Sequence, residues 1–153
     1  IDTHKVVRSH LITGWWKDTG KLEDMLEANR IVLSGIEGRI DGEVDAAGRV
    51  EGQVIIGKGT TVRASTLRGP LIIGENCRIE ESFVGPFTSI HNGSVIELSE
   101  IEHSILLEEA KVLGLRHRIE SSLLGRNVEI VSRDTRPVTY RFLVGDLARI
   151  EVH

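Results

Sequence analysis

The chain has 153 residues, of which 40% are hydrophobic and 27% charged, and its formal net charge is −4. This length supports one sizeable core, or one domain with an appendage. The mild acidity and the lack of a long basic run argue against nucleic acid as a partner, and the absence of a long apolar run argues against a membrane. The lone Cys77 cannot form a disulfide within the chain, which favours a cytoplasmic location.

The first part of the chain predicts a strand followed by one helix. Residues 5–13 have the composition of a strand, and residues 22–33 place their apolar side chains on one face at helical spacing. Asp18 or Thr19 stands where it could cap the start of this helix. We expect the helix to link the preceding part of the polypeptide to the region that follows.

One seven-residue pattern recurs between residues 56 and 130: aliphatic, glycine, two polar or turn-prone residues, a small residue, any residue, aliphatic. Good copies are 56–62, 73–79, 84–90 and 124–130, and weaker copies without the glycine are 50–56, 90–96 and 106–112. An aliphatic residue at every sixth position fits neither a helix nor a long alternating strand. It predicts short strands separated by corners and stacked as a β-solenoid of about five coils. The aliphatic residues expected to point inward include Ile56, Ile73, Val84, Leu106 and Leu124.

The fourth place of the pattern predicts a corner with positive φ. Gly59, Asn76, Gly93 and Asn127 occupy this place, and these residue types tolerate the left-handed region. The pattern resembles the hexapeptide repeat of the left-handed parallel β-helix, and the left handedness is implied by that resemblance alone, against the usual crossover rule. A β-sandwich with glycine turns is the alternative.

The solenoid is expected to be irregular in several places. Residues 63–70 and 98–104 interrupt the pattern, so they should shift the register by one residue or make a corner bulge. Residues 113–122 contain three basic side chains in a row and predict an exposed excursion. The predicted domains are 1–34, a trailing strand, motif and helix; 35–137, the β-helix with an irregular first coil; and 138–153, two strands that cap the open end of the solenoid.

Residues 15–20, Trp-Trp-Lys-Asp-Thr-Gly, resemble the Trp-x-Asp-Thr-Gly motif of the sugar-1-phosphate nucleotidyltransferases. Together with the helix, the short solenoid and residues 140–146, Tyr-Arg-Phe-Leu-Val-Gly-Asp, the chain resembles the last part of the long glucose-1-phosphate thymidylyltransferases. The resemblance implies that Asp18 is one of two aspartates that hold a catalytic Mg²⁺ and that Trp16 lines the sugar pocket. Taken without the resemblance, Asp18 would be a helix cap and Trp16 a core or interface aromatic.

The resemblance covers only part of such an enzyme. The family's glycine-rich nucleotide loop, its second metal aspartate and its phosphate-binding lysine have no counterpart in these residues, so we expect the fragment alone to be inactive. Sugar 1-phosphate and nucleoside triphosphate would be partners of the intact polypeptide. Uridylyl-, adenylyl- and guanylyltransferases share the motif theme, so the nucleotide base stays open.

Two further hypotheses stand beside nucleotidyl transfer: acyl transfer is its rival, whereas a structural role is compatible with it. The solenoid also resembles hexapeptide acyltransferases, in which a histidine acts as general base; the candidates are His91, His103 and His117, although exposed corner histidines are common. Alternatively the solenoid serves only oligomerisation or regulation. Its faces would then associate as a homo-oligomer, with a trimer favoured, through the aliphatic regions near Ile55, Leu71, Phe83 and Leu123. Cys77 falls at the small fifth place of a repeat and predicts a buried thiol.

Overall fold

A computed structural model describes residues 21–133, 140, 142 and 148–152. Within them, one helix, α1 (Leu22–Leu33), is followed by seventeen short strands that form three sheets. Sheet A contains β1 (Arg39–Ile40), β4 (Val54–Ile56), β7 (Leu71–Ile73), β10 (Thr88–Ile90), β13 (Ile105–Leu106) and β16 (Leu123–Leu124). Sheet B contains β2 (Glu43–Val44), β5 (Thr61–Arg63), β8 (Arg78–Glu80), β11 (Val95–Glu97), β14 (Lys111–Leu113) and β17 (Glu129–Val131). Sheet C contains β3 (Arg49–Glu51), β6 (Thr66–Arg68), β9 (Phe83–Val84), β12 (Glu100–Glu102) and β15 (Ile119–Glu120).

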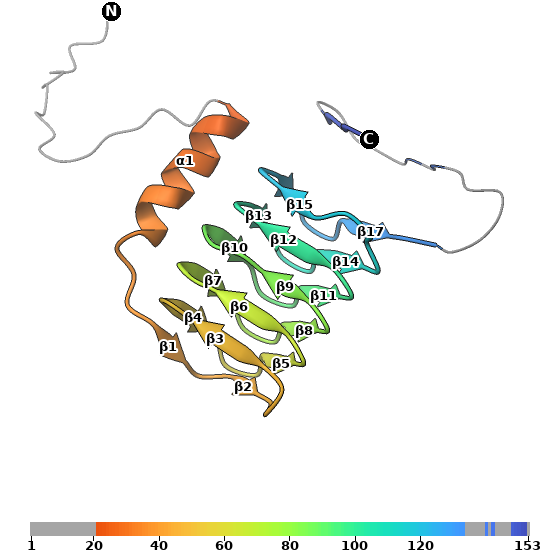
Figure 1. The fold of residues 1–153 in the computed structure, drawn as a ribbon. Coiled ribbons are helices and arrows are strands. Elements are labelled where there is room, and N and C mark those ends of the chain that lie inside the picture. Colours follow the sequence, from red (N-terminus) through yellow and green to blue (C-terminus); the bar gives the residue numbers. More distant parts are fainter. Residues whose placement is uncertain (1–20, 134–139, 141, 143–147, 153) are drawn as a thin grey trace, which may run out of the picture.

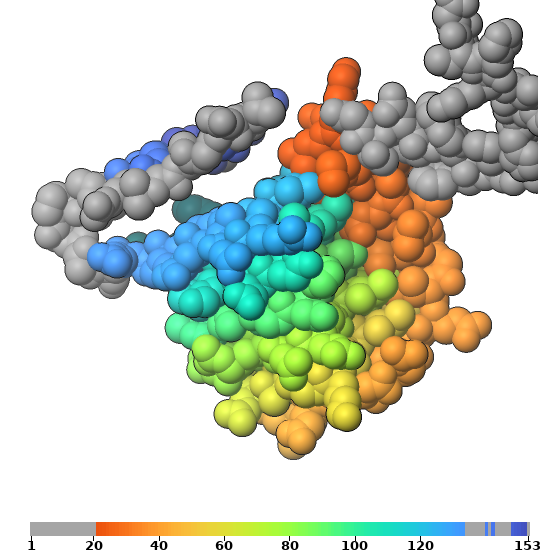
Figure 2. Space-filling view, turned by 180° about the vertical axis from the view of Figure 1, so that it is seen from behind, coloured from red at the N-terminus to blue at the C-terminus, as the bar shows by residue number. Residues whose placement is uncertain are grey.

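The chain winds through the three sheets in turn, so each coil contributes one strand to each sheet. Every recorded strand pair is parallel, and each strand pairs with the third strand after it in sequence. Figure 1 shows the coils stacked one on another, with α1 lying along the stack, and in the space-filling view of Figure 2 the coils appear as successive bands in sequence order. This topology confirms the predicted fold class, a mainly β hexapeptide-repeat parallel β-helix of about five coils, and excludes the antiparallel β-sandwich.

The length of a coil varies along the solenoid, as predicted. In sheet A, Ile55 pairs with Ile72, Ser89 with Ile105, and Ile105 with Leu123, so the three intervals along the chain are unequal. Each of the two interrupting segments contains a regular strand of sheet C, β6 or β12. The expectation of a register shift is confirmed.

The core is a column of aliphatic side chains between the three sheets. Ile56, Ile73 and Val84 are fully buried and Leu106 is 1% exposed, which confirms that they point inward. Leu124 also packs against the core but is only partly buried, because its strand is the last of sheet A among the described residues. The predicted excursion at 113–122 is exposed at residues 116–118 but also contains β15 of sheet C.

The three corners of a coil are turned in different ways. We name each corner after the two sheets that it joins. Segments such as 57–60 and 74–77 form the A–B corner, and segments such as 64–65 and 81–82 form the B–C corner. Segments such as 85–87 form the C–A corner. Gly59, Asn76, Gly93 and Asn127 lie at the A–B corner with φ of +75°, +54°, +71° and +55°, as predicted. The recurrent glycine phrase therefore marks mainly one corner of each coil.

Three of the B–C corners adopt positive φ without glycine, which was not predicted from the sequence, whereas Gly114 has φ of +67° at the corner between β14 and β15. Ala64, Glu81 and Leu98 have φ of +44°, +46° and +46°. Each is followed by a buried serine, at positions 65, 82 and 99. The hydroxyl of each serine accepts a hydrogen bond from a backbone N–H of the next coil: Ser82 N–H to Ser65 Oγ at 3.0 Å, Ser99 N–H to Ser82 Oγ at 3.2 Å, and Leu115 N–H to Ser99 Oγ at 3.1 Å. This serine ladder satisfies buried amides where the sheets change direction.

The helix α1 has the predicted bounds but a narrower buried face. Leu26 and Leu33 are buried, whereas Val32 is 60% exposed. The N-cap residue is Lys21, and no side chain caps the helix there. Asp18 and Thr19, predicted to cap this helix, lie outside the described residues, and neither occupies the N-cap position.

Two predicted elements fall largely outside the described residues. The N-terminal strand at 5–13 lies entirely outside them. Of the predicted C-terminal strands, only residues 140, 142 and 148–152 are described, and these are not in strands. The division into three domains stays a prediction.

Candidate functional site

The two residues implicated by the motif, Trp16 and Asp18, lie outside the described residues. Among the residues that the structure describes, no group of three or more His, Cys, Asp or Glu side chains could hold a metal ion. The predicted metal and sugar roles therefore stay predictions. The part of this region that the structure does describe is α1, which begins four positions after Asp18.

Among the described residues, the side chain of Asn29 hydrogen-bonds helix α1 to the solenoid. Its Nδ2 donates a hydrogen bond to the backbone carbonyl of Phe87 at 2.9 Å, and its Oδ1 accepts one from Ser89 Oγ at 2.6 Å. Phe87 lies at the C–A corner, and Ser89 is the outward-facing residue of β10. The contact thus connects residues that are far apart in the sequence. Neither this contact nor its partners were predicted from the sequence.

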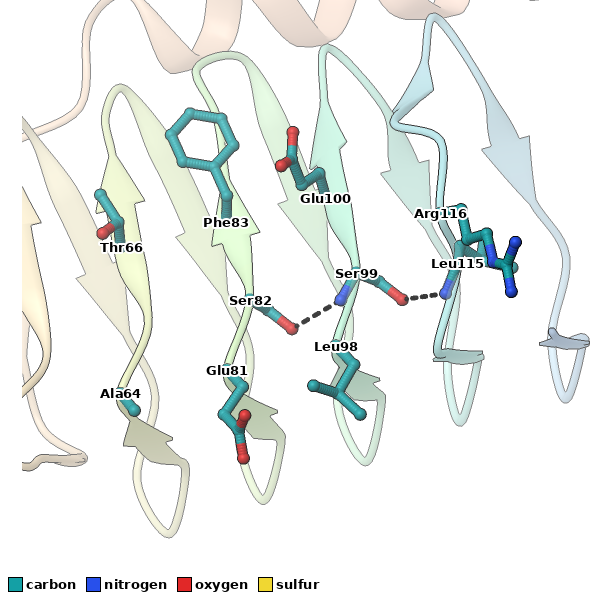
Figure 3. A pocket seen from close by; sticks show the side chains of 10 residues that line it. All are labelled: Ala64, Thr66, Glu81, Ser82, Phe83, Leu98, Ser99, Glu100, Leu115 and Arg116. Carbon is teal, nitrogen blue, oxygen red and sulfur yellow. Dashed lines mark hydrogen bonds between the residues drawn. The ribbon is translucent and has the colours of Figure 1, made fainter. Parts of the chain in front are cut away.

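An open hollow of about 570 Å³ lies over the B–C corner and the adjoining part of sheet C (Figure 3). Its lining residues are Ala64, Thr66, Glu81, Ser82, Phe83, Leu98, Ser99, Glu100, Leu115 and Arg116. The hydroxyls of Ser82 and Ser99 belong to the serine ladder, as the dashed lines in Figure 3 show. With two carboxylates in its lining, this shallow surface is poorly suited to hold the phosphates of a nucleotide.

The outer face of sheet C carries a network of charges around one aromatic ring. The guanidinium carbons of Arg68 and Arg118 lie 5.8 Å and 4.9 Å from the centre of the Phe83 ring. Arg118 also donates hydrogen bonds to Glu100 at 2.8 Å and Glu102 at 3.0 Å, and these bonds raise its pKa. Exposed pairs of this kind contribute little to stability, because water and salt screen them. The network is a stabilised surface between coils rather than a reactive site.

The three candidate histidines lie at three different corners, so they do not form one site. His91, at the A–B corner, accepts a hydrogen bond at Nδ1 from the Asn92 N–H at 2.8 Å, and its Nε2 lies 3.7 Å from Glu108. His103, at the C–A corner, has Nδ1 3.3 Å from Ser121 Oγ. His117 is exposed in the link between β14 and β15.

Cys77 is a buried thiol, as predicted. Its side chain is 2% exposed, and Sγ donates to the backbone carbonyl of His91 at 3.2 Å. Burial raises the pKa of this thiol, because the thiolate would lose its hydration. A thiol held in its neutral form is a poor nucleophile. Cys77 is therefore a core residue rather than a reactive group.

The stacked parallel coils and the recurrent corner phrase define the protein as a hexapeptide-repeat β-solenoid. The chain is 45% identical over 152 residues to the glucose-1-phosphate thymidylyltransferases of Streptomyces griseus and Streptomyces antibioticus, and each match covers 99% of this chain and 42% of the relative. The predicted resemblance is therefore confirmed: the chain is related along its length to the C-terminal part of glucose-1-phosphate thymidylyltransferases.

More distant comparisons agree with this relationship or add nothing to it. The chain is 35% identical over 149 residues to the low-salt glycan biosynthesis nucleotidyltransferase Agl11 of Haloferax volcanii, covering 95% of this chain and 42% of that protein. No protein-family model matches the chain. Among solved structures, a hexapeptide transferase family protein from Anaplasma phagocytophilum is 16% identical with a TM-score of 0.22, and the match covers 68% of this chain and 80% of that one. In the described part of the chain, no helix is long and apolar enough to span a membrane.

Proposed function

We propose that this chain is the C-terminal portion of a polypeptide that transfers a thymidylyl group from dTTP to glucose 1-phosphate, giving dTDP-glucose and pyrophosphate. The observation that carries the proposal is the 45% identity to glucose-1-phosphate thymidylyltransferases across 99% of the chain. The chain spans 42% of the length of these relatives, so the reaction belongs to the intact polypeptide. A cytoplasmic location is part of this proposal and is supported by the lone Cys77.

Within that reaction, we assign Asp18 to metal binding and Trp16 to the sugar pocket, on the strength of the Trp-x-Asp-Thr-Gly motif. A carboxylate oxygen is the donor that Mg²⁺ prefers, and a bound Mg²⁺ would neutralise charge on the substrate phosphates. The phosphate oxygen of the sugar attacks the α-phosphorus of dTTP and pyrophosphate leaves, so no protein nucleophile is needed. The protein aligns two anions and offsets their charge.

The substitution Asp18→Asn in the intact polypeptide tests this assignment. Asparagine keeps the size of the side chain but removes its charge. Because the N-cap of α1 is Lys21, the substitution should leave the melting temperature unchanged. We expect turnover to fall at least about a hundredfold, equivalent to about 3 kcal/mol of transition-state stabilisation. Turnover is measured as pyrophosphate release from dTTP and glucose 1-phosphate. The isolated 153-residue chain is the control that is expected to be inactive. Undiminished turnover would rule out the metal role.

The solenoid itself is proposed to serve oligomerisation or regulation, with a trimer as the assembly. Sheet A presents half-buried aliphatic side chains outward at Ile55, Ile72, Ile105 and Leu123. Because α1 is bonded to Ser89 on the same face, another copy would pack against the surface that α1 and these side chains form together. Leu71, named in the sequence analysis as part of such a face, is fully buried and points into the core, so that expectation is wrong. Acyl transfer is not supported, because the three candidate histidines lie at different corners of the described solenoid.

A further inference from the structure

The contact between α1 and β10 uses both ends of one amide group. Asn29 donates through Nδ2 to the Phe87 carbonyl and accepts through Oδ1 from the Ser89 hydroxyl, at 2.9 Å and 2.6 Å. The corner that receives it is itself fixed to the previous coil, since the Phe87 N–H donates to the Pro70 carbonyl at 2.7 Å. The contact therefore joins the helix to a part of the solenoid whose backbone is already held in place.

Two apolar side chains flank this contact on the same face of α1. Leu26 and Leu33 are 5% and 1% exposed and lie three positions before and four positions after Asn29. At this spacing the three side chains line one side of the helix. Apolar burial alone would let a helix slide or rotate by a small amount, because it has no directional preference. The two hydrogen bonds of Asn29 give the contact a direction and a register.

The position of α1 bears on the motif because the two are close in sequence. Asp18 precedes the first residue of α1 by four positions and Asn29 by eleven. A hydrogen-bonded helix transmits a displacement along its length with little loss, since every turn is tied to the next. A shift of α1 on sheet A would therefore move the point at which the motif is attached.

We propose that Asn29 is a positioning residue for nucleotidyl transfer: by fixing α1 to Phe87 and Ser89 of the solenoid, it sets the placement of the Trp-x-Asp-Thr-Gly segment. The solenoid then acts on catalysis through β10 as well as supporting assembly. This inference rests on the proposed function, because it concerns the same reaction.

The chemistry of the contact provides an isosteric test. In Asn29→Asp the side chain keeps its shape, and Ser89 can still donate to one oxygen. The other oxygen would face the Phe87 carbonyl, so an N–H···O bond becomes a repulsion between two acceptors. On the solenoid side, Ser89→Ala removes one hydrogen bond and Ser89→Thr retains the hydroxyl. Val32→Ala is the matched control on α1, because Val32 is 60% exposed.

The experiment uses the intact polypeptide after thymidylyl transfer by the wild type has been measured. For each variant, kcat and KM for dTTP and glucose 1-phosphate, the half-saturating Mg²⁺ concentration and the melting temperature are determined, with assays run well below the lowest melting temperature. We expect Asn29→Asp to lower kcat/KM about tenfold and to raise the half-saturating Mg²⁺ concentration, since small misplacements of reacting groups have effects of this size or larger. Ser89→Ala should have a smaller effect in the same direction. Ser89→Thr and Val32→Ala should match the wild type.

A double-mutant cycle separates positioning from general destabilisation. If the contact transmits position, the loss in the double variant Asn29→Asp, Ser89→Ala should be smaller than the product of the two single losses. Multiplicative losses in the double variant, or wild-type kinetics and Mg²⁺ dependence in Asn29→Asp, would overturn the positioning role while the proposed function stands. A wild-type polypeptide that forms no dTDP-glucose would overturn both.

Discussion

The A–B and B–C corners both turn the chain sharply between closely stacked coils, but they depend on different features. At the A–B corner, Gly57 leaves out a side chain, because a Cβ there would lie 2.5 Å from the backbone carbonyl carbon of Gly74 in the next coil. At the B–C corner, a hydroxyl is added instead, and Ser82 Oγ accepts the Ser99 N–H at 3.2 Å. The residue type at the A–B corner is restricted by the space between coils. At the B–C corner it is restricted by the need to satisfy buried amides with hydrogen bonds. Substitutions at the two corners should therefore differ in size and in cause.

The largest effect is expected from Gly57→Ala. The new methyl group meets backbone atoms of Gly74 and Glu75, at 2.5 Å and 2.7 Å, and backbone cannot move aside as a flexible side chain can. Steric overpacking of this kind should lower the free energy of unfolding by about 3 kcal/mol, measured by urea denaturation of the chain.

Gly125 provides a matched control for Gly57, because it holds the same place in the last coil. Of the described residues, a Cβ at Gly125 would meet the side chain of Val128, at an ordinary 3.6 Å. Gly125→Ala should leave stability unchanged or raise it by about 0.5 kcal/mol through lower entropy of the unfolded chain. Equal losses at Gly57 and Gly125 would show that stacking space does not decide the effect.

An intermediate effect is expected from Ser82→Ala in the serine ladder. The substitution leaves the N–H of Ser99 without its partner, and Ser99 is only 3% exposed. An unsatisfied buried donor should lower the free energy of unfolding by about 2 kcal/mol. Ser122 is the control: its hydroxyl donates to Glu120 at 2.8 Å but accepts no backbone amide within the described residues. Ser122→Ala should lower stability by only about 0.5 kcal/mol or less, as is usual for an exposed position. A larger loss there than at Ser82 would contradict the ladder.

The smallest effect is expected from Leu98→Gly at the B–C corner. Leu98 has φ of +46° and is 60% exposed, so glycine removes backbone strain and little buried area. Relief of backbone strain and the greater entropy of glycine in the unfolded chain should nearly cancel. The free energy of unfolding, measured by thermal denaturation, should therefore stay within about 1 kcal/mol of the wild type. Val131→Gly, in β17 at 41% exposure, serves for comparison, because a strand glycine should only destabilise. A loss at Leu98 greater than that at Val131 would show that leucine is required at this corner.

The contrast between the two corners also explains what could be predicted from the sequence. Gly59 and Asn76 are local signals, because their residue types favour the left-handed region in any chain. Glu81 and Leu98 carry no such signal, and their positive φ is imposed by coil-to-coil hydrogen bonds and burial nearby. A sequence signal did exist, because the serines at positions 65, 82 and 99 recur at equal intervals. This equal spacing identifies the serine ladder only when the length of a coil is already known.

By itself, the sequence determined the features that depend on local residue type and period: the solenoid and its inward aliphatic residues, the helix at 22–33, the glycine and asparagine corners, and the buried Cys77. The resemblance to the nucleotidyltransferases came from one short motif together with the order of these elements. The tertiary structure decided the exact register of each coil, the serine ladder and the contact of Asn29 with Phe87 and Ser89. These features join residues that lie at least a full coil apart in the sequence, and their energy depends on geometry that exists only after the coils have stacked.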